Sequence, residues 1–258
     1  MKITIIGTGN VAFHLSKILK EKGQTVAQIV GRNAEKLAWL ASVLEIDYTT
    51  NFSEINLESD LYIIAVSDDA IAEIAEKLAQ VLDNQLVVHT SGSIPSTVLQ
   101  PYFKNFGTFY PLQTFSINSE PNFSEIPIFI NATPQYNTVF LEKIALILSP
   151  KVHELADEKR VVLHVAAVFV NNFTNHLFSI ADEISTMENL PFDVLKPLIQ
   201  ETIRKIENNN PIEVQTGPAK RGDQITIQKH LDFLKKRTPQ YLGVYEVLSN
   251  SILKKFTK

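Results

Sequence analysis

Three small residues near the N-terminus have the spacing of a phosphate-binding turn. Gly7, Gly9 and Ala12 form a G-x-G-x-x-A pattern in the stretch ITIIGTGNVAFHL. The first glycine permits a tight turn, the second lets a pyrophosphate approach the backbone, and the alanine lets helix and strand pack closely. Free N–H groups at the start of the following helix suit the phosphates. A glycine turn without a ligand would have the same spacing, but we predict a dinucleotide site. Its contacts would be Gly7, Thr8, Gly9, Asn10 and Val11.

The residues after the second predicted strand indicate which dinucleotide binds. Sites for NAD or FAD usually place an acid here to bond the ribose hydroxyls. This chain instead reads Val30-Gly31-Arg32-Asn33. An arginine at this point suits the 2′-phosphate of NADP through charge-assisted hydrogen bonds and stacking on adenine. We therefore predict NADP(H), with Arg32 and Asn33 as cofactor contacts, and we disfavour S-adenosylmethionine and a flavin. The alternative is a surface arginine that only begins a helix.

A long apolar segment in the second half carries polar residues at helical spacing. It covers residues 161–181 and contains His164, Asn171, Asn172 and Asn175. Seven residues make nearly two helical turns, so we expect His164 and Asn171 on one face, with Asn172 slightly further round. Histidine exchanges protons near neutral pH, which suits general acid catalysis, and Asn172 suits a carbonyl or carboxylate oxygen. Polar residues in a buried helix often serve packing alone, and that alternative stays open.

A second histidine ends a predicted strand. His89 precedes a Thr-Ser-Gly turn, and the carboxyl ends of strands in open α/β sheets face the ligand crevice. His89 is therefore a second acid/base candidate, although histidines at strand ends are often structural. Gln113 and Thr114 lie in a loop that we expect to line the same crevice. No pair of histidines has metal-ligand spacing such as H-E-x-x-H, so we predict no metal site.

The stretch TGPAKRGD, residues 216–223, combines two glycines, a proline and two cations. We predict that Lys220 and Arg221 reach an active site, their own or that of a partner subunit, and bind an anionic substrate or the cofactor phosphate. The same letters also describe an interhelical loop with two solvated cations, capped by Asp223 or Thr226. The sequence leaves both interpretations open.

The elements that must position these residues change character near residue 155. Up to that point short apolar strands alternate with helical patterns, which predicts a parallel sheet covered on both faces. Beyond it, apolar residues recur at three- and four-residue spacing, and we find no convincing strand. We predict an α/β Rossmann-type domain at 1–155 and an all-helical domain at 156–258. The 161–186 segment is apolar nearly all round, so we expect it to be buried on all sides.

The composition argues against several classes of function. The 258 residues carry a formal net charge of −4, so the chain has no global basic field to hold nucleic acid. The absence of cysteine excludes disulfides, thiolate metal sites and a cysteine nucleophile. The 161–181 segment is long enough to span a bilayer, but its polar residues are costly in lipid. We therefore expect a cytoplasmic protein that does not enter a membrane.

Several motifs together resemble a known family. They are G-x-G-x-x-A, Gly31-Arg32-Asn33, AVSDDAI (65–71), HTSGS (89–93), YPLQTF (110–115), LHVAAVFVNN (163–172) and TGPAKRGD (216–223). The chain resembles a bacterial branch of predicted NADP-dependent oxidoreductases that join a Rossmann-like domain to a C-terminal domain of unknown function. That branch falls in the β-hydroxyacid and phosphogluconate dehydrogenase superfamily. The resemblance implies the fold and the cofactor, but it supplies no substrate.

The resemblance also implies roles for individual residues. Further cofactor contacts would be Ala65, Val66, Ser67 and Thr90. The turn at Ser91 and Gly92 would hold the substrate near the nicotinamide, and we count Ser91 with His164 and Asn172 as catalytic. The superfamily's catalytic lysine, four residues before the asparagine, is replaced here by Val168. Dimers in the superfamily interlock their helical domains, so we expect a homodimer through the C-terminal helices.

These observations predict an NADP(H)-dependent oxidoreductase. It would transfer a hydride to or from a small, anionic carbonyl, imine or hydroxy compound. Contacts to that substrate would come from Ser91, Gly92, Gln113, Lys220 and Arg221. Val168 at the lysine position keeps one alternative open, a sensor or scaffold that binds NADP(H) without turnover.

Overall fold

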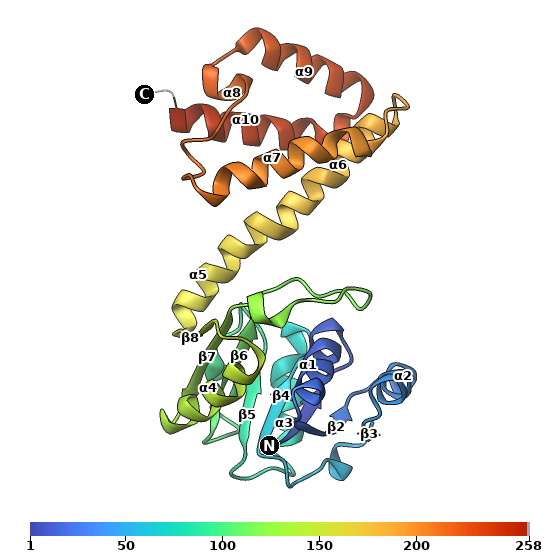
Figure 1. Ribbon diagram of the computed structural model, residues 1–258, viewed down its shortest axis with the longest axis vertical. Coiled ribbons are helices and arrows are strands. Elements are labelled where there is room, and N and C mark those ends of the chain that lie inside the picture. The colour runs from blue at the N-terminus through green and yellow to red at the C-terminus, as the bar shows by residue number, and fades with distance from the viewer. Residues whose placement is uncertain (257–258) are drawn as a thin grey trace. The chain divides into compact units, whose positions relative to one another are not determined.

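The computed structural model describes residues 1–256 and separates into two compact units, Met1–Asn171 and Asn172–Lys258. The first unit is built on one eight-stranded sheet with the strand order β3-β2-β1-β4-β5-β6-β7-β8 (Figure 1). Its strands are β1 (Lys2–Ile6), β2 (Thr25–Val30), β3 (Tyr48–Thr49), β4 (Leu61–Ile64), β5 (Leu86–His89), β6 (Phe106–Pro111), β7 (Ile128–Thr133) and β8 (Val152–Glu154). The order reverses between β1 and β4, which is where doubly wound sheets form a ligand crevice.

The sheet is parallel except at one pair of strands. β6 and β7 are antiparallel, with Phe106 opposite Thr133 and Pro111 opposite Ile128. The other six neighbouring pairs are parallel. The expectation of a parallel sheet is therefore wrong at this pair. Between β6 and β7 the chain forms only a short 3-10 turn, η4 (Phe123–Glu125), and no crossing helix, so it returns in the opposite direction.

Helices cover both faces of the sheet because side chains alternate along its strands. The covering elements are α1 (Asn10–Glu21), α2 (Ala34–Leu44), α3 (Ile71–Leu78) and α4 (Tyr136–Leu148), with 3-10 turns η1 (Phe52–Glu54), η2 (Asp68–Ala70) and η3 (Ser96–Leu99). In β4, Leu61 and Ile63 join the apolar cluster of α1, α2 and α4. Tyr62 and Ile64 join the opposite cluster, which includes α3 and η3. The predicted Rossmann-type architecture is confirmed.

After β8 the described chain continues as helices. They are α5 (Asp157–Ala167), η5 (Val168–Phe173), α6 (Thr174–Thr186), η6 (Phe192–Leu195), α7 (Lys196–Glu207), α8 (Pro218–Arg221), α9 (Gln224–Arg237), η7 (Pro239–Tyr241) and α10 (Leu242–Phe256). The change from strands to helices thus falls after Glu154, close to the predicted boundary at 155. The chain passes from the first compact unit to the second inside η5, between Asn171 and Asn172.

The segment η5 is a π-helical turn. A π-turn holds one residue more than an α-helical turn, and the extra residue rotates the side chains that follow by about 100°. The expectation that His164 and Asn171 share a face assumed a regular α-helix, and that assumption is wrong from Val168 onward. Such turns are frequent at functional sites, and this one contains both Val168 and Asn172.

The long helix from Asp157 to Thr186 is mostly exposed, and only Arg160 and Ile180 of its residues are buried. Val162 and Val170 expose 70% and 75% of their surface, and Phe169 exposes 62%. The expectation that 161–186 is buried on all sides is therefore wrong for a single chain, whose described residues leave these side chains uncovered. By length and composition alone, with a mean hydropathy of 1.3, this helix is also able to cross a membrane. The core helix of a soluble protein has the same two properties.

Candidate functional site

The G-x-G-x-x-A turn joins β1 to α1 at the carboxyl edge of the sheet. Gly7 has a φ of 140°, and a Cβ at this position would lie 2.1 Å from the carbonyl oxygen of Ala65. The Gly7 N–H donates to the carbonyl of Val30 at 2.8 Å. The turn is thus held between the chain segments that follow β4 and end β2, and both the conformation and the close approach require glycine.

The start of α1 is open in a way that fits a pyrophosphate. Gly9 is the N-cap of α1, no side chain among residues 1–256 caps the free N–H groups of the first turn, and that turn holds no acidic residue. A Cβ at Gly9 would meet no atom within 4 Å. Thr8 and Val11, which flank Gly9 and Asn10, are half-buried. Free N–H groups and the positive end of the helix dipole favour a bound phosphate.

Arg32 and Asn33 follow β2 at the same edge. Both are exposed. Arg32 Nη1 lies 3.6 Å from Glu73 Oε2, and its side chain keeps 62% of its surface in solvent. The Asn33 side chain caps α2 by accepting from the Lys36 N–H at 2.9 Å. Arg32 is therefore available to a phosphate, whereas Asn33 Oδ1 already holds a structural hydrogen bond.

Other predicted contacts also follow strand ends. Ala65 is buried and Val66 half-buried directly after β4, and Ser67 is exposed as the N-cap of η2. Gln113 and Thr114 are exposed after β6, where Gln113 Oε1 accepts from the Thr114 N–H at 2.8 Å. All five residues lie at the carboxyl ends of parallel strands, the edge at which such sheets bind ligands.

The connection after β6 is attached to α1. Asn10 Nδ2 donates to the carbonyl of Phe115 at 2.8 Å, and His14 Nε2 lies 2.8 Å from the carbonyl of Ser116. Because a carbonyl only accepts, His14 Nε2 carries a proton. The side chain of Asn10, a predicted cofactor contact, therefore positions this connection. His14 is buried and serves packing.

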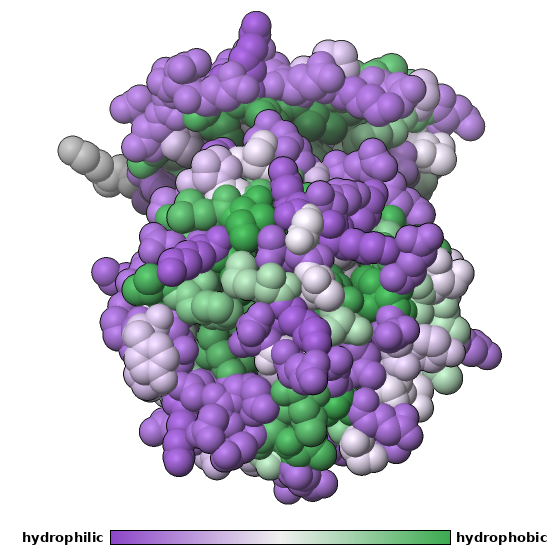
Figure 2. All heavy atoms as spheres, turned by 60° about the horizontal axis from the view of Figure 1, so that its bottom comes forward, coloured by the Kyte–Doolittle hydropathy of each residue, from purple (hydrophilic) through white to green (hydrophobic). Residues whose placement is uncertain are grey.

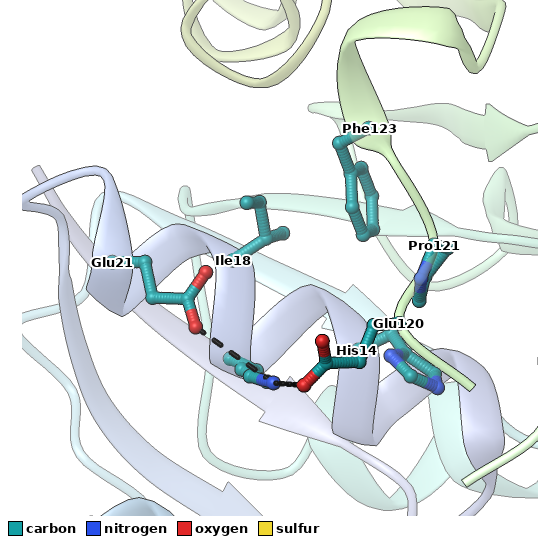
Figure 3. A pocket seen from close by; sticks show the side chains of 7 residues that line it. His14, Ile18, Glu21, Glu120, Pro121 and Phe123 are labelled. Carbon is teal, nitrogen blue, oxygen red and sulfur yellow. Dashed lines mark ion pairs between the residues drawn. The ribbon is translucent and has the colours of Figure 1, made fainter. Parts of the chain in front are cut away.

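A cavity of about 220 Å³ lies between α1 and this connection (Figure 3). Lys17 Nζ lies 3.9 Å from Glu21 Oε1 and 3.7 Å from Glu120 Oε1. Ile18 and Phe123 form the apolar part of the lining. Two carboxylates balance the one lysine, so this cavity is unsuited to the phosphates of a nucleotide.

The turn after β5 is held by its own side chains. His89 Nδ1 accepts from the Ser91 N–H at 3.2 Å. Ser91 Oγ accepts from the N–H groups of Ser93 and Ile94 at 3.1 and 3.0 Å. The Ser93 hydroxyl donates to Asp68. The oxygen of Ser91, predicted as catalytic, is thus engaged in shaping the turn.

His89 is neutral in this environment. It is fully buried, and burial together with the nearby charge of Arg160 lowers its pKa to about 4. Its Nε2 has no hydrogen-bond partner among the residues that the structure describes. The next residue, Thr90, donates its N–H to the carbonyl of Ile64 at 3.1 Å. Because a group with so low a pKa gains no proton near neutral pH, His89 suits a structural role better than acid/base chemistry.

His164 packs against this turn at Gly92. A Cβ at Gly92 would lie 2.4 Å from His164 Nδ1 and 2.9 Å from Tyr110 Cζ, so only glycine leaves room for both rings. Tyr110 Oη lies 3.0 Å from His164 Nδ1. Burial raises the pKa of the Tyr110 phenol, which therefore stays protonated. The structure thus brings together Gly92 and His164, which the sequence predicted separately. It adds Tyr110, which the sequence analysis did not single out although this residue lies near the carboxyl end of β6.

A fully buried arginine on α5 ties the helix to the turn. Arg160 donates to four oxygens, those of the Ser91 carbonyl (3.1 Å), the Ile94 carbonyl, Thr108 Oγ1 (3.1 Å) and Asp157 Oδ1 (2.5 Å). Asp157 Oδ2 accepts from the N–H and hydroxyl of Ser96 at 2.6 and 2.8 Å. Burial acts to raise the pKa of Asp157, but the bonds from Ser96 and Arg160 outweigh it and lower the pKa. The sequence signal was an Asp-x-x-Arg spacing, which usually marks a solvated pair.

The remaining predicted residues lie in the second unit. Asn172 is exposed within η5. Lys220 Nζ donates to the carbonyl of Gln215 at 2.7 Å and lies 5.1 Å from the centre of the Phe256 ring. Arg221 is exposed and makes no ion pair within residues 1–256. The described part of the chain holds no group of three His, Cys, Asp or Glu side chains suited to a metal ion.

Comparison with known proteins places this geometry in a family. A family model described as NADP oxidoreductase coenzyme F420-dependent matches residues 2–92, and a domain of unknown function (DUF2520) matches residues 126–252. The solved structure of a putative NADP oxidoreductase from Bacteroides fragilis is 42% identical, with 98% of each chain covered and a TM-score of 0.93. An imine reductase from Myxococcus stipitatus, solved with NADP+, is 15% identical over 100% of each chain, and its TM-score of 0.68 shows a shared fold.

One curated protein is also similar. Glycerol-3-phosphate dehydrogenase [NAD(P)+] of Thermoanaerobacter sp. (strain X514) is 31% identical over 112 residues, which are 39% of this chain and 34% of that protein. The chain thus spans only about a third of that relative's length. The family model and the Bacteroides structure confirm the predicted oxidoreductase class and NADP as its cofactor. Since the Bacteroides protein matches over nearly its whole length, the chain belongs to the family of NADP oxidoreductases in which this nucleotide-binding region precedes a DUF2520 domain.

Proposed function

We propose that the chain transfers a hydride between NADP(H) and a small, anionic carbonyl, imine or hydroxy compound. One observation carries this proposal: the uncapped start of α1 at Gly9 lies at the same sheet edge as the contact of His164 with Gly92. An open phosphate site and a proton-exchanging side chain at one edge are what reduction of a polar double bond requires. The Rossmann-type unit followed by helices also supports a place in the β-hydroxyacid and phosphogluconate dehydrogenase superfamily.

The residues divide between binding and proton transfer. When bound, NADPH supplies the hydride. The N–H groups at the start of α1 would hold its pyrophosphate, and Arg32 its 2′-phosphate. His164 would exchange the proton at the substrate oxygen or nitrogen. Tyr110 is bonded to His164 Nδ1, which leaves Nε2 for that exchange. Asn172 would bind a substrate oxygen.

The proposed negative charge of the substrate rests on the α8 region. Arg221 is exposed and makes no ion pair within the described chain, and a guanidinium without such a contact suits a carboxylate or phosphate. Lys220 already donates to the carbonyl of Gln215 and lies over the Phe256 ring. Of the two cations, Arg221 is therefore the better candidate for the substrate contact.

We also propose that two copies of the chain pair through α5, α6 and α7. Four hydrophobic residues are buried in the described part of the second unit, namely Ile180, Ala219, Ile227 and Leu234. On α7, Leu198 and Ile203 expose 65% and 50% of their surface. Hydrophobic areas interrupt the hydrophilic surface in Figure 2. A small unit that buries so little apolar surface needs a permanent partner to cover its exposed apolar residues. A second copy of the same chain is the partner that is always available.

Calorimetric titration of NADPH and NADH tests the proposed function. The wild type is expected to prefer NADPH, and Arg32→Ala to weaken NADPH binding about tenfold or more because it removes charge-assisted bonds, leaving NADH unaffected. Lys36→Ala, which removes an exposed cation from the first turn of the following helix, α2, is the matched control. The absence of binding for both nucleotides would overturn the proposal.

Turnover separates the enzyme from the sensor. Purified protein with NADPH is screened against small keto acids, imines and aldehydes, and the loss of NADPH absorbance is followed. An enzyme oxidises NADPH with at least one class of compound, and His164→Gln abolishes most of that rate. A sensor binds NADPH as tightly but oxidises none of it.

A further inference from the structure

Arg160 fixes the orientation of two peptide groups in the turn after β5. Its guanidinium is fully buried and donates hydrogen bonds to the carbonyl oxygens of Ser91 and Ile94. In a trans peptide the C=O and the following N–H point in opposite directions. The Ser91 carbonyl points to Arg160, so the Gly92 N–H points away from it.

That N–H is an unused donor. The neighbouring N–H groups of Thr90, Ser91, Ser93 and Ile94 all have acceptors. Gly92 is buried, yet its N–H meets no acceptor within the described residues. Buried N–H groups without an acceptor are rare because they forgo both water and protein partners. The Gly92 N–H is therefore available to an acceptor on a bound molecule.

The same arginine also places the histidine. His164 follows Arg160 by four residues on α5, so both side chains project from one face of the helix. The His164 ring lies against Gly92, where it fills the space that a Cβ would need. Asp157 lies 2.5 Å from Arg160 and balances its charge. One buried ion pair thus determines both the orientation of the Gly92 N–H and the position of the His164 imidazole beside it.

We propose that Arg160 is a positioning residue for the reaction. It turns the Gly92 N–H toward an oxygen of the substrate, a carboxylate or carbonyl oxygen, and keeps that donor beside His164. The identity of the acceptor rests on the proposed function, whereas the orientation of the peptide is a property of the chain itself. Asp157 takes part by holding Arg160 in place.

An isotope-labelled pair of residues reports this orientation directly. Among the nine glycines of the chain, Gly92 alone follows a serine. Protein with ¹³C in serine carbonyls and ¹⁵N in glycine therefore gives one Ser91–Gly92 NMR signal. Its carbon frequency reports the bond from Arg160 to the Ser91 carbonyl, and its nitrogen frequency reports the Gly92 N–H. Arg160→Lys keeps the charge but loses the planar fork, so we expect both frequencies to move. Arg204→Lys, an exposed arginine on α7, should move neither.

Titration with acetate tests the donor itself. In the wild type the Gly92 signal should shift to saturation, and Arg160→Lys should weaken this response about tenfold because the N–H no longer faces the acceptor. The variant's KM for a carbonyl substrate should rise while its affinity for NADPH stays unchanged. Identical frequencies and identical titrations in the wild type and Arg160→Lys would refute the proposal.

Two further outcomes are decisive. Where Arg160→Lys does not fold, Asp157→Asn takes its place: a displaced Ser91–Gly92 signal supports the positioning role and an undisplaced one refutes it. Where the wild type binds no NADPH, the proposed function fails, and the labelled signal still decides whether Arg160 orients Gly92.

Discussion

His89 links the stability of the first unit to pH. Burial, and then the charge of Arg160, lower its pKa from 6.5 to about 4 in the folded chain. The unfolded chain therefore binds a proton more readily, so the stabilisation is fully present above pH 6.5 and is lost as the pH falls toward about 4. The shift corresponds to roughly 3 kcal/mol of unfolding free energy.

A substitution isolates this effect. His89→Asn removes the titrating group, so the free energy of unfolding should fall less steeply between pH 6.5 and about 4 than it does in the wild type. Urea unfolding at a series of pH values measures the difference. His153→Asn, at an exposed histidine, should leave the slope as in the wild type. Equal slopes for wild type and His89→Asn would show that His89 is not held neutral.

Gly92 is sensitive to a single added methyl group. In Gly92→Ala the new Cβ would meet His164 Nδ1 at 2.4 Å, so the imidazole must leave its place on the turn. We expect a loss of about 1–3 kcal/mol in stability from overpacking and a large fall in kcat with NADPH affinity unchanged. Thermal unfolding and steady-state kinetics measure these effects. Gly243→Ala is the control, because a Cβ there meets nothing within 4 Å.

At the scale of elements, the ion pair of Arg160 and Asp157 attaches α5 to the sheet. Arg160→Met would leave the Asp157 carboxylate and two carbonyls without their buried donor, and we expect a loss of about 3–5 kcal/mol. In the double variant with Asp157→Asn the losses should be less than additive, because both changes break one network. Urea unfolding of the two single variants and the double variant measures the coupling, and simple additivity would mean that the two residues act independently.

Much of the element order was predictable because it is encoded locally. Apolar residues at two-residue spacing define the strands, and the three- to four-residue spacing defines the helices. The start of α9 was also predictable, since Asp223 caps it by accepting from the Thr226 N–H at 3.0 Å. The direction of β7 and the π-turn η5 were not predicted, because neither changes the hydrophobic periodicity of the amino-acid sequence.

The candidate site, too, could be predicted only where its residues lie close together in the sequence. The turn at Gly7 and Gly9 was predictable because all its residues lie within one short stretch. The bond of Tyr110 to His164 joins residues 54 apart, and that of Arg160 to the Ser91 carbonyl joins residues 69 apart. A buried pair of arginine and aspartate has the same sequence as a solvent-exposed pair. Burial decides the role of the pair, and it can be seen only in the folded structure.

At the scale of the whole molecule, the exposed apolar helices predict a homodimer. Leu198→Lys places a charge on the uncovered face of α7, and we expect it to convert dimers to monomers because a buried unpaired charge is strongly unfavourable. Sedimentation velocity measures the change. Val43→Lys, at a residue that is 51% exposed on α2, should remain dimeric. A wild type that sediments as a monomer would contradict the proposal.

The boundary between the units has a consequence for how such a protein can change. The boundary between the units falls between Asn171 and Asn172. His164, Tyr110 and the glycine turn therefore all belong to the first unit. A new helical unit joined at this boundary would inherit the nucleotide site, His164 and Gly92 together. The helical unit is then open to exchange as one module, while the nucleotide site and the side chains around Gly92 pass on unchanged from one chain to its descendants.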